Sequence, residues 1–281
     1  MPFQLTEVAR TINNSYNKGM NIIDKLKKFY KEFKGDKGYI GSTSKGRLIP
    51  YFQVSKTASP TLIVQYSIHA REYITTYLAL KQITQFKRYG KVGTVYFIPM
   101  VNIDGVRICL DSKPLYKANA NGVDLNVNFD ARWGKGKDNV RYKNDQNFIG
   151  ACPFSEPESK SLRDFTLSVA PDMTVSYHSK GEEIYYEFYQ DKNIKKRDYS
   201  LAKTVADVTG YAIKSTPNSC GGYKDWCIEK LQIPALTIEV GDDRLKHPIG
   251  EKNLNDIYKK NEWVIYTLTQ KLWENDEKKI Y

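Results

Sequence analysis

The sequence predicts an α/β fold with a central, mixed and mostly parallel twisted sheet that is flanked by helices on both faces. Short runs rich in β-branched and aromatic residues alternate with longer segments whose apolar residues recur at helical spacing. Neither an internal repeat nor a low-complexity linker divides the 281 residues, and hydrophobic residues make up 41% of them, a proportion typical of globular proteins. Alternating strands and helices favour a layered sheet, in which ligands bind beyond the carboxyl ends of the strands.

The individual elements follow from this alternation. The runs expected to form strands are 47–55, 61–68, 92–102, 172–178, 184–190 and 235–241. Helices are expected over 24–37, 71–86, 155–169, 201–210 and 255–273. One of these helices is expected to begin at Ser155, a good N-cap residue, because Glu158 follows three positions later as in a capping box.

The chain is predicted to consist of an N-terminal helical segment over 1–35 that packs on a single domain over 36–281. Its most apolar runs are far shorter than the roughly 20 residues that a membrane helix needs, so no membrane association is expected. The first 30 residues hold no continuous apolar core and no small-residue cleavage site. We therefore expect a cytoplasmic protein or one whose leader has been removed, and Met1 favours the cytoplasm.

Lysine is abundant, and the formal net charge is +11. Lysines gather in 24–37 and 192–197, which predicts solvated faces that favour solubility. Alternatively, these charges hold an anionic partner such as a cell-wall fragment or nucleic acid, but no nucleic-acid-binding motif is present and no such partner is expected. The four cysteines show no C-x-x-C pairing, which favours reduced structural residues over a disulfide framework or a zinc knuckle.

A pair of potential metal ligands follows the second expected strand. His69 lies at the end of that strand, and Glu72 follows three residues later in the first turn of a helix, so both side chains lie on one side. A catalytic zinc site often uses two histidines and a glutamate and leaves a fourth position open. Of the two other histidines, His178 at a strand end is favoured over His247 in a polar loop beside a proline. The alternative is a chance spacing, with His178 bonded to a backbone carbonyl.

Beyond the histidines, eight short segments occur in an order that matches a known family. They are GSTSKGRLIP, HARE followed by YIT, VNIDGV, GVDLNVNF, SEPE, SYHSKG, GGYKDW and IPALTIEVG, and they extend from about residue 41 to 241. By these segments the chain resembles the carboxypeptidase A/T-type zinc peptidases, also called funnelins. The stretch KANANGVDLNVNFDARWG, followed by PFSEPE, is more similar to the bacterial branch that hydrolyses γ-D-glutamyl-diamino acid bonds of peptidoglycan stem peptides than to the digestive carboxypeptidases.

The resemblance implies a zinc carboxypeptidase-like fold and one bound zinc ion. It implies that His69, Glu72 and His178 are the zinc ligands and that the metal polarises the scissile carbonyl and acidifies water. Glu239 matches the family's general base, and a charged residue inside an apolar strand is costly unless it faces a polar cavity. Asp124 is expected either to accept the ring N–H of a zinc histidine or to support its own loop.

The resemblance also implies residues that contact the substrate. Arg71 is expected to line the substrate groove, with a surface salt bridge as the alternative role, and Asn126 matches an asparagine that binds the substrate carboxylate. The family usually has an arginine after that asparagine, but this chain has Val127, which cannot bind a carboxylate. Arg132 is offered as a replacement. Lys117 takes the place of the family's oxyanion-stabilising arginine and keeps its charge but not its planar fork, unless it is a solvated loop lysine.

A third departure concerns a tyrosine. The digestive enzymes carry a mobile tyrosine four residues before the GG pair, and Pro217 occupies that position here. Tyr223, directly after GG, is offered as a substitute that contacts the substrate, with packing in the core as the alternative.

Together these features predict a zinc-dependent amide hydrolase that cuts the γ-D-glutamyl-diamino acid bond, with a peptide or muropeptide as its partner. The first alternative is an ordinary metallocarboxypeptidase that removes C-terminal residues, against which Val127 counts. The second is a non-catalytic peptide-binding relative. The sequence leaves the oligomeric state open.

Overall fold

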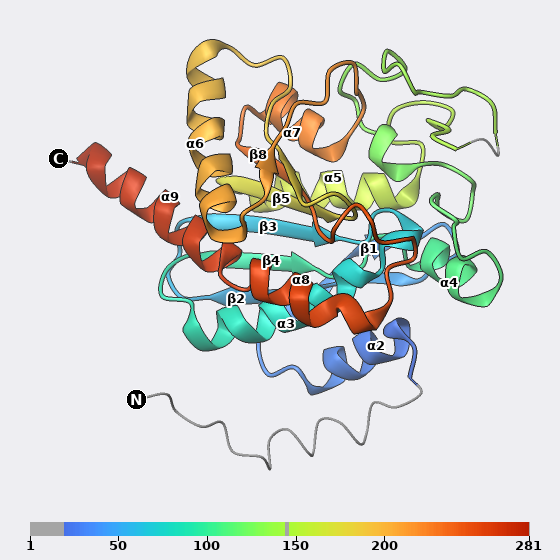
Figure 1. Cartoon of the computed structure of the whole chain (residues 1–281), viewed down its shortest axis with the longest axis horizontal. Coiled ribbons are helices and arrows are strands. Elements are labelled where there is room, and N and C mark those ends of the chain that lie inside the picture. Colours follow the sequence, from blue (N-terminus) through green and yellow to red (C-terminus); the bar gives the residue numbers. More distant parts are fainter. Residues whose placement is uncertain (1–19, 144–145, 281) are drawn as a thin grey trace.

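A computed structural model describes residues 20–143 and 146–280 and contains one eight-stranded sheet in the order β1-β2-β4-β3-β5-β8-β6-β7 (Figure 1). The strands are β1 (Lys37–Ser42), β2 (Leu48–Ser55), β3 (Thr61–Tyr66), β4 (Thr94–Ile98), β5 (Met173–His178), β6 (Glu183–Tyr185), β7 (Ala212–Ile213) and β8 (Ala235–Glu239). The four central strands β4, β3, β5 and β8 run parallel, and antiparallel pairs of β1 with β2, β2 with β4 and β6 with β8 extend them. The sheet is therefore mixed and mostly parallel in its centre, which confirms the predicted fold class.

Helices cover both faces of the sheet. They are α2 (Ile22–Glu32), α3 (Ile74–Tyr89), α4 (Ile103–Asp111), α5 (Pro157–Val169), α6 (Lys192–Thr209), α7 (Tyr223–Leu231), α8 (Leu254–Asn261) and α9 (Val264–Ile280). Successive residues of β2 separate the two layers, because Phe52 packs on Phe29 of α2 whereas Tyr51 packs on Phe165 of α5. Helices α3, α8, α9 and α6 lie on the α2 side, and α7 joins α5 on the other side.

The central strands form the core. Every residue of β5 is buried, and five of the six residues of β3 are buried as well, as expected for parallel strands covered on both faces. Helix α2 adds Ile22, Ile23 and Leu26 to the same core cluster, and Asn21 caps its first turn by accepting a hydrogen bond from the Asp24 N–H. Helix α6 ends at Gly210 in the left-handed conformation.

Several elements differ from the sequence-based expectation. Strand β1 was not expected because KGYIGS contains two glycines and a register shift between Tyr39 and Gly41. The run 255–273 was expected to be one helix, but the structure divides it between α8 and α9. Helices α4 and α7 were also not predicted. Both begin inside segments that were interpreted as family motifs, and the spacing of their apolar residues was not used.

The start of α5 also differs. The N-cap is Glu156 and Pro157 occupies the first turn, so Ser155 does not cap the helix and instead donates its hydroxyl to Glu156 Oε1 at 2.8 Å. Glu158 turns inward and accepts hydrogen bonds from the Ser44 N–H at 3.0 Å and from Asn119 Nδ2 at 3.1 Å. Its burial raises the pKa of the Glu158 carboxyl. The glutamate therefore connects the start of α5 to two loops rather than forming a capping box.

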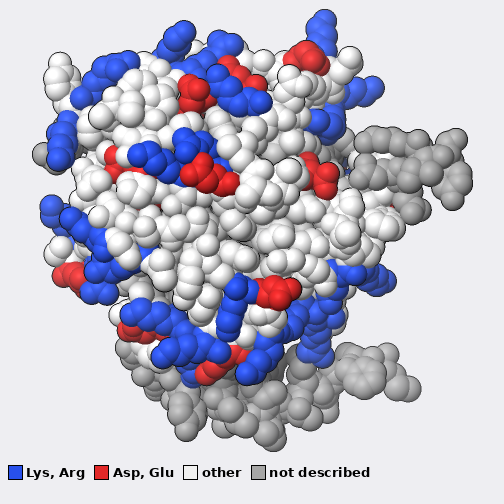
Figure 2. All heavy atoms as spheres, turned by 180° about the vertical axis from the view of Figure 1, so that it is seen from behind, with Lys and Arg blue, Asp and Glu red and all other residues white. Residues whose placement is uncertain are grey.

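The surface carries scattered charge. On the face seen in Figure 2, lysine and arginine side chains lie mostly around the border, with acidic side chains among them and a broad uncharged area between. Within the described residues, no helix combines the length and the apolar character needed to cross a membrane. Of the expected N-terminal segment 1–35, residues 1–19 lie outside the described residues, and the boundary at residue 36 stays a prediction.

Candidate metal centre and active site

Three neighbouring parallel strands bring distant parts of the chain together at their carboxyl ends. Strands β3 and β5 are paired so that Tyr66 lies opposite Tyr177, and both strands end within one residue of this pair. Strand β8 lies on the other side of β5 and places Glu239 opposite His178. The chain that leaves β3 at this edge carries His69. This edge of the sheet is where α/β folds commonly bind ligands.

A short 3₁₀ turn sets the geometry of the first two ligands. The turn η1 (Ala70–Glu72) has His69 as its N-cap, and the Glu72 N–H donates to the His69 carbonyl at 3.2 Å. Residues three apart in a 3₁₀ turn are eclipsed, so the carboxylate lies directly beside the imidazole. The sequence predicted the same juxtaposition, but it assigned the turn to the following helix, which begins only at Ile74.

Three buried side chains converge at this point. His69 Nδ1 lies 2.9 Å from Glu72 Oε1, and His178 Nδ1 lies 3.1 Å from Glu72 Oε2 and 3.2 Å from His69 Nδ1. Tetrahedral coordination with metal–nitrogen distances of about 2.0–2.1 Å separates two ligand atoms by about 3.3 Å. The spacing and the donor set of two imidazoles and one carboxylate therefore fit a zinc ion, and these three residues could hold one.

The electrostatics of the cluster also favour a cation. Burial lowers the pKa of His178, which keeps its ring in the neutral form that binds metal. Burial alone would also lower the pKa of His69, but the negative charges of Glu72 and Asp124 outweigh it and raise the pKa of His69 to about 9. The two carboxylates thus attract a positive charge to the place where the ring nitrogens meet.

A loop supplies the next layer of contacts. His69 Nε2 lies 3.1 Å from Asp124 Oδ1, and Lys117 Nζ lies 2.6 Å from Asp124 Oδ2. Burial would raise the pKa of Asp124, but Lys117 and His69 outweigh it and hold that pKa well below its ordinary value. The loop is fixed to the sheet because Asn102 Nδ2 donates to the carbonyls of Ile68 and Ala118 at 3.1 and 3.0 Å. The low pKa favours the ionised carboxylate, and in this form Asp124 can orient the His69 ring.

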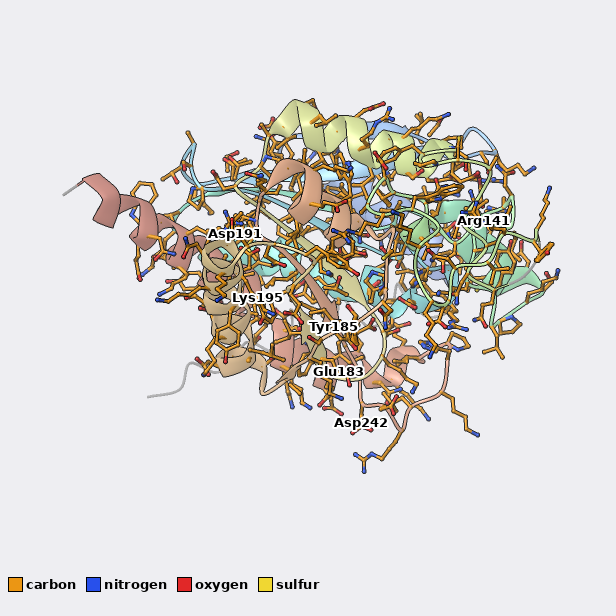
Figure 3. All side chains as sticks on the ribbon, turned by 90° about the horizontal axis from the view of Figure 1, so that it is seen from above. Arg141, Glu183, Tyr185, Asp191, Lys195 and Asp242 are labelled. Atoms are coloured by element: carbon orange, nitrogen blue, oxygen red, sulfur yellow. The ribbon has the colours of Figure 1, made fainter. Side chains whose placement is uncertain are left out.

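Glu239 lies at the end of β8, beside the cluster. It is paired with His178 on one side and with Glu183 of β6 on the other. Its Oε2 atom is buried and has no hydrogen-bond partner among the described residues. Burial, and next the charge of Glu72, raise the pKa of Glu239 well above its ordinary value, and a cation held by the cluster would act in the opposite direction. Glu183 is bonded to the Tyr185 hydroxyl, and Figure 3 shows both side chains near each other.

A cavity of about 180 Å³ opens onto His69. We call it the metal-site cavity, and its walls include His69, Lys117, Asp124, Asn126, Val127 and Asp138. Among the described residues that line it, Lys117 is the only lysine or arginine, and Asp124 and Asn147 Oδ1 already occupy its ammonium group at 2.6 and 2.7 Å. The cavity can thus surround a polar group next to the metal cluster, but it offers no unoccupied cation.

Comparison with known proteins is consistent with this geometry. A profile described as zinc carboxypeptidase matches residues 22–262. The chain belongs to the zinc carboxypeptidase family. This confirms the resemblance seen in the sequence and identifies the chain as a metallopeptidase.

Three individual relatives show how similar this chain is to known proteins. The gamma-D-glutamyl-L-diamino acid endopeptidase 1 of Lysinibacillus sphaericus is 28% identical over 277 residues, which cover 85% of this chain and 68% of that protein. Carboxypeptidase B of Bos taurus is 26% identical over 241 residues, covering 72% of this chain and 57% of that protein. The bovine thrombin-activatable fibrinolysis inhibitor, solved with a tick carboxypeptidase inhibitor, has a TM-score of 0.79 at 19% identity over 97% of this chain and 98% of that one. The last similarity shows the fold alone.

Two further residues of the sequence-based set also lie in this region. Asn126 lines the metal-site cavity and accepts a hydrogen bond from the Tyr223 N–H at 3.2 Å, which fixes the orientation of its amide. Arg71 lines a second cavity on the other side of Lys117. The structure thus places Asn126 in the wall of the metal-site cavity, and it places Arg71 next to that cavity rather than at the metal cluster.

Arg132, expected to bind the substrate carboxylate, lies away from the metal-site cavity. The Arg132 Nε donates to Glu229 Oε1 at 3.0 Å, and its guanidinium stacks 3.4 Å above the Tyr189 ring. Arg132 is absent from the described residues that line the metal-site cavity, so the expectation that it replaces the missing arginine does not fit this geometry.

Tyr223 requires a correction. Its side chain is fully buried, its hydroxyl lies 2.8 Å from Thr166 Oγ1, and its ring packs against Phe129 and Trp226. A side chain enclosed in the core cannot contact substrate. The packing role is the one that the structure supports, and only the backbone N–H of Tyr223 reaches the site, through Asn126.

Three residues near the site escaped the sequence analysis. Asn147 bonds to Lys117, Asp138 lines the metal-site cavity, and Lys113 lines the second cavity. They lie in loops without regular periodicity. Their placement depends on long-range contacts such as the Lys137 N–H to the Asn218 carbonyl at 2.9 Å, which no local pattern reveals.

Proposed function

We propose that the chain hydrolyses the γ-D-glutamyl-diamino acid bond of peptidoglycan stem peptides with one zinc ion held by His69, Glu72 and His178. Support for this substrate class comes from the metal-site cavity, which has Val127 where an arginine would bind a terminal carboxylate. Its one cation among the described walls, Lys117, is already paired with Asp124. A diamino acid whose carboxyl group is joined to a further residue needs no such clamp. The 28% identity to a γ-D-glutamyl-L-diamino acid endopeptidase supports the same substrate class.

Each residue of the proposed active site has a separate role in the hydrolysis. When bound, zinc supplies a Lewis acid that polarises the scissile carbonyl and makes water more acidic. Glu239 accepts a proton from the attacking water and passes it to the nitrogen of the leaving amine. Lys117, beside His69, places a positive charge near the carbonyl oxygen, where negative charge develops in the transition state. Asp124 keeps the His69 ring in one orientation while this occurs.

The leaving group is the diamino acid. Asn126 and Asp138 both line the metal-site cavity, and Asp138 has no ion-pair or hydrogen-bond partner among the described residues. A diamino acid carries a second amino group, which is cationic at neutral pH. Asp138 is the group in the cavity that can pair with this ammonium, and Asn126 can donate to a neighbouring carbonyl.

The test compares wall fragments with ordinary carboxypeptidase substrates. The zinc-loaded protein is incubated with tripeptide and tetrapeptide fragments containing γ-D-glutamyl-diaminopimelate and with hippuryl dipeptides, and the products are measured by mass spectrometry. We expect cleavage of the γ-D-glutamyl bond and loss of this activity in Glu239→Gln and after chelation. Preferential hydrolysis of the hippuryl substrates would instead establish an ordinary metallocarboxypeptidase. Bound zinc without hydrolysis of any substrate would indicate a binding protein.

A further inference from the structure

We propose that a second cavity, lined by Arg71, Lys113 and Lys117, binds the free α-carboxylate of the γ-linked glutamyl residue on the acyl side of the scissile bond. This inference rests on the proposed function, because it names the part of that substrate which the cavity selects. We call this space, of about 470 Å³, the cationic cavity. It would distinguish γ-linked glutamyl substrates from α-linked peptides whose acyl residue has an uncharged side chain.

The cationic cavity adjoins the metal-site cavity. The two share Lys117, Asp124 and Asn147 as walls, so a layer of side chains separates them. Arg71 belongs to the same 3₁₀ turn as Glu72 and follows His69 by two residues. A substrate whose reacting carbonyl lies at the metal cluster therefore has the cationic cavity beside it, on the side away from Asn126 and Val127.

Lys117 is held by Asp124 and Asn147, but the other two cations of the cationic cavity lack partners among the described residues. Neither the Arg71 guanidinium nor the Lys113 ammonium has a hydrogen bond or ion pair among the described residues, and Arg71 Nε is buried without an acceptor. A buried donor without a partner costs free energy that a bound acceptor would recover. A carboxylate is the ligand that matches a guanidinium, because its two oxygens accept two parallel N–H bonds.

The substrate has a carboxylate at a suitable distance. In a γ-glutamyl linkage the reacting carbonyl carbon and the α-carboxylate carbon are joined by four single bonds of about 1.5 Å, which span about 5 Å when extended. An ordinary peptide has an amide in the corresponding region of its acyl residue rather than a negative charge. The cationic cavity would thus contribute binding energy to the γ-linked substrate that an α-linked peptide with an uncharged side chain on its acyl residue cannot obtain.

The experiment uses two substrates that differ in one group. One is an N-acetyl-γ-D-glutamyl-diamino acid peptide with a free α-carboxylate, and the other is its α-carboxamide. We expect the zinc-loaded wild type to favour the carboxylate in kcat/KM by about 10- to 100-fold, as for a hydrogen-bonded charged group. Arg71→Gln should reduce this preference to about threefold or less, and Lys113→Gln should reduce it in part. Arg88→Gln, the same change at an exposed position near the far end of α3, should leave the preference unchanged.

A binding measurement separates the failure of this inference from the failure of the proposed function. Calorimetry with the zinc-loaded Glu239→Gln protein gives the affinity of both peptides without hydrolysis. Tighter binding of the carboxylate that is lost in Arg71→Gln supports the inference, even if the wild type cuts neither peptide and the proposed bond is wrong. Equal affinity for carboxylate and carboxamide overturns the inference, even if both peptides are hydrolysed. An Arg71→Gln protein that retains the wild-type discrimination overturns it as well.

Discussion

The substitution Asp124→Asn tests how strongly the loop supports the metal cluster. Asp124 is 1% exposed, and its two oxygens contact His69 Nε2 at 3.1 Å and Lys117 Nζ at 2.6 Å. Asparagine keeps the shape, keeps an oxygen for the ring N–H and keeps the acceptor for the Asn126 N–H at 2.9 Å. The substitution therefore removes one negative charge with little change in packing.

The magnitude follows from the two contacts that are weakened. A hydrogen bond with a charged partner contributes about 1.5–3 kcal/mol, against about 0.5–1.5 kcal/mol for a neutral one, so the His69 contact loses about 1–1.5 kcal/mol. In addition, the Lys117 ammonium loses its carboxylate partner and becomes an uncompensated cation beside the metal cluster. Together these effects should weaken zinc binding by about 10- to 100-fold, the range found when such supporting carboxylates are removed.

The assay is a competition titration of the purified protein against a zinc chelator at fixed pH. Asp164→Asn is a matched control, because Asp164 is an exposed aspartate on α5 that pairs with the neighbouring Arg163. We expect the control to bind zinc like the wild type and Asp124→Asn to bind it about 10- to 100-fold more weakly. If Asp124→Asn stays within a factor of two of the wild type, Asp124 does not support the metal cluster and the reasoning is wrong.

Three further predictions concern catalysis, selectivity and folding. Glu239→Gln should reduce kcat by about 100- to 10,000-fold, because Glu239 is expected to transfer protons. The zinc content, measured by atomic absorption, should stay at the wild-type value, and loss of zinc in the variant would show that Glu239 is a zinc ligand. Asp138→Asn should lower kcat/KM about two- to fivefold for a diamino acid substrate but not for its analogue without the second amino group, as for an exposed ion pair, and equal effects on both would refute the pairing. Gly41→Ala should destabilise the fold by about 1–3 kcal/mol in urea unfolding, because φ is +153° and a Cβ would overlap with Ser161. Adding Ser161→Gly should restore part of that loss, and a lack of any recovery would show that the backbone conformation alone is responsible.

The central sheet and the metal cluster could be predicted from the sequence because their information is local. The buried strands β3, β5 and β8 are short runs rich in β-branched and other apolar residues, and the ligands lie at or just beyond the ends of β3 and β5. A parallel sheet brings such ends to one edge, so His69 and His178 could be expected to meet although 109 residues separate them. Strand β1 was not predicted, because its two glycines and its register shift interrupt the alternation of side chains that marks a strand.

The remainder of the site depends on loops whose contacts are set by the tertiary structure. Arg132 and Tyr223 were selected by their nearness in sequence to motif residues, yet one pairs with Glu229 and the other points into the core. Lys113 had no motif to mark it, although the fold places it in the same cavity wall as Arg71. Residue type and spacing can thus identify a metal cluster, whereas the direction of a loop side chain follows from long-range packing.

The most direct test of the metal centre is a zinc titration of the wild-type chain and of His178→Ala in a metal-buffered solution. We expect one zinc ion bound per wild-type chain and, in His178→Ala, an affinity lower by at least about 100-fold, the upper end of the loss for a supporting residue. This expectation would be contradicted if the wild type bound no zinc, or if His178→Ala kept the wild-type affinity, because the three converging side chains would then not form a metal centre.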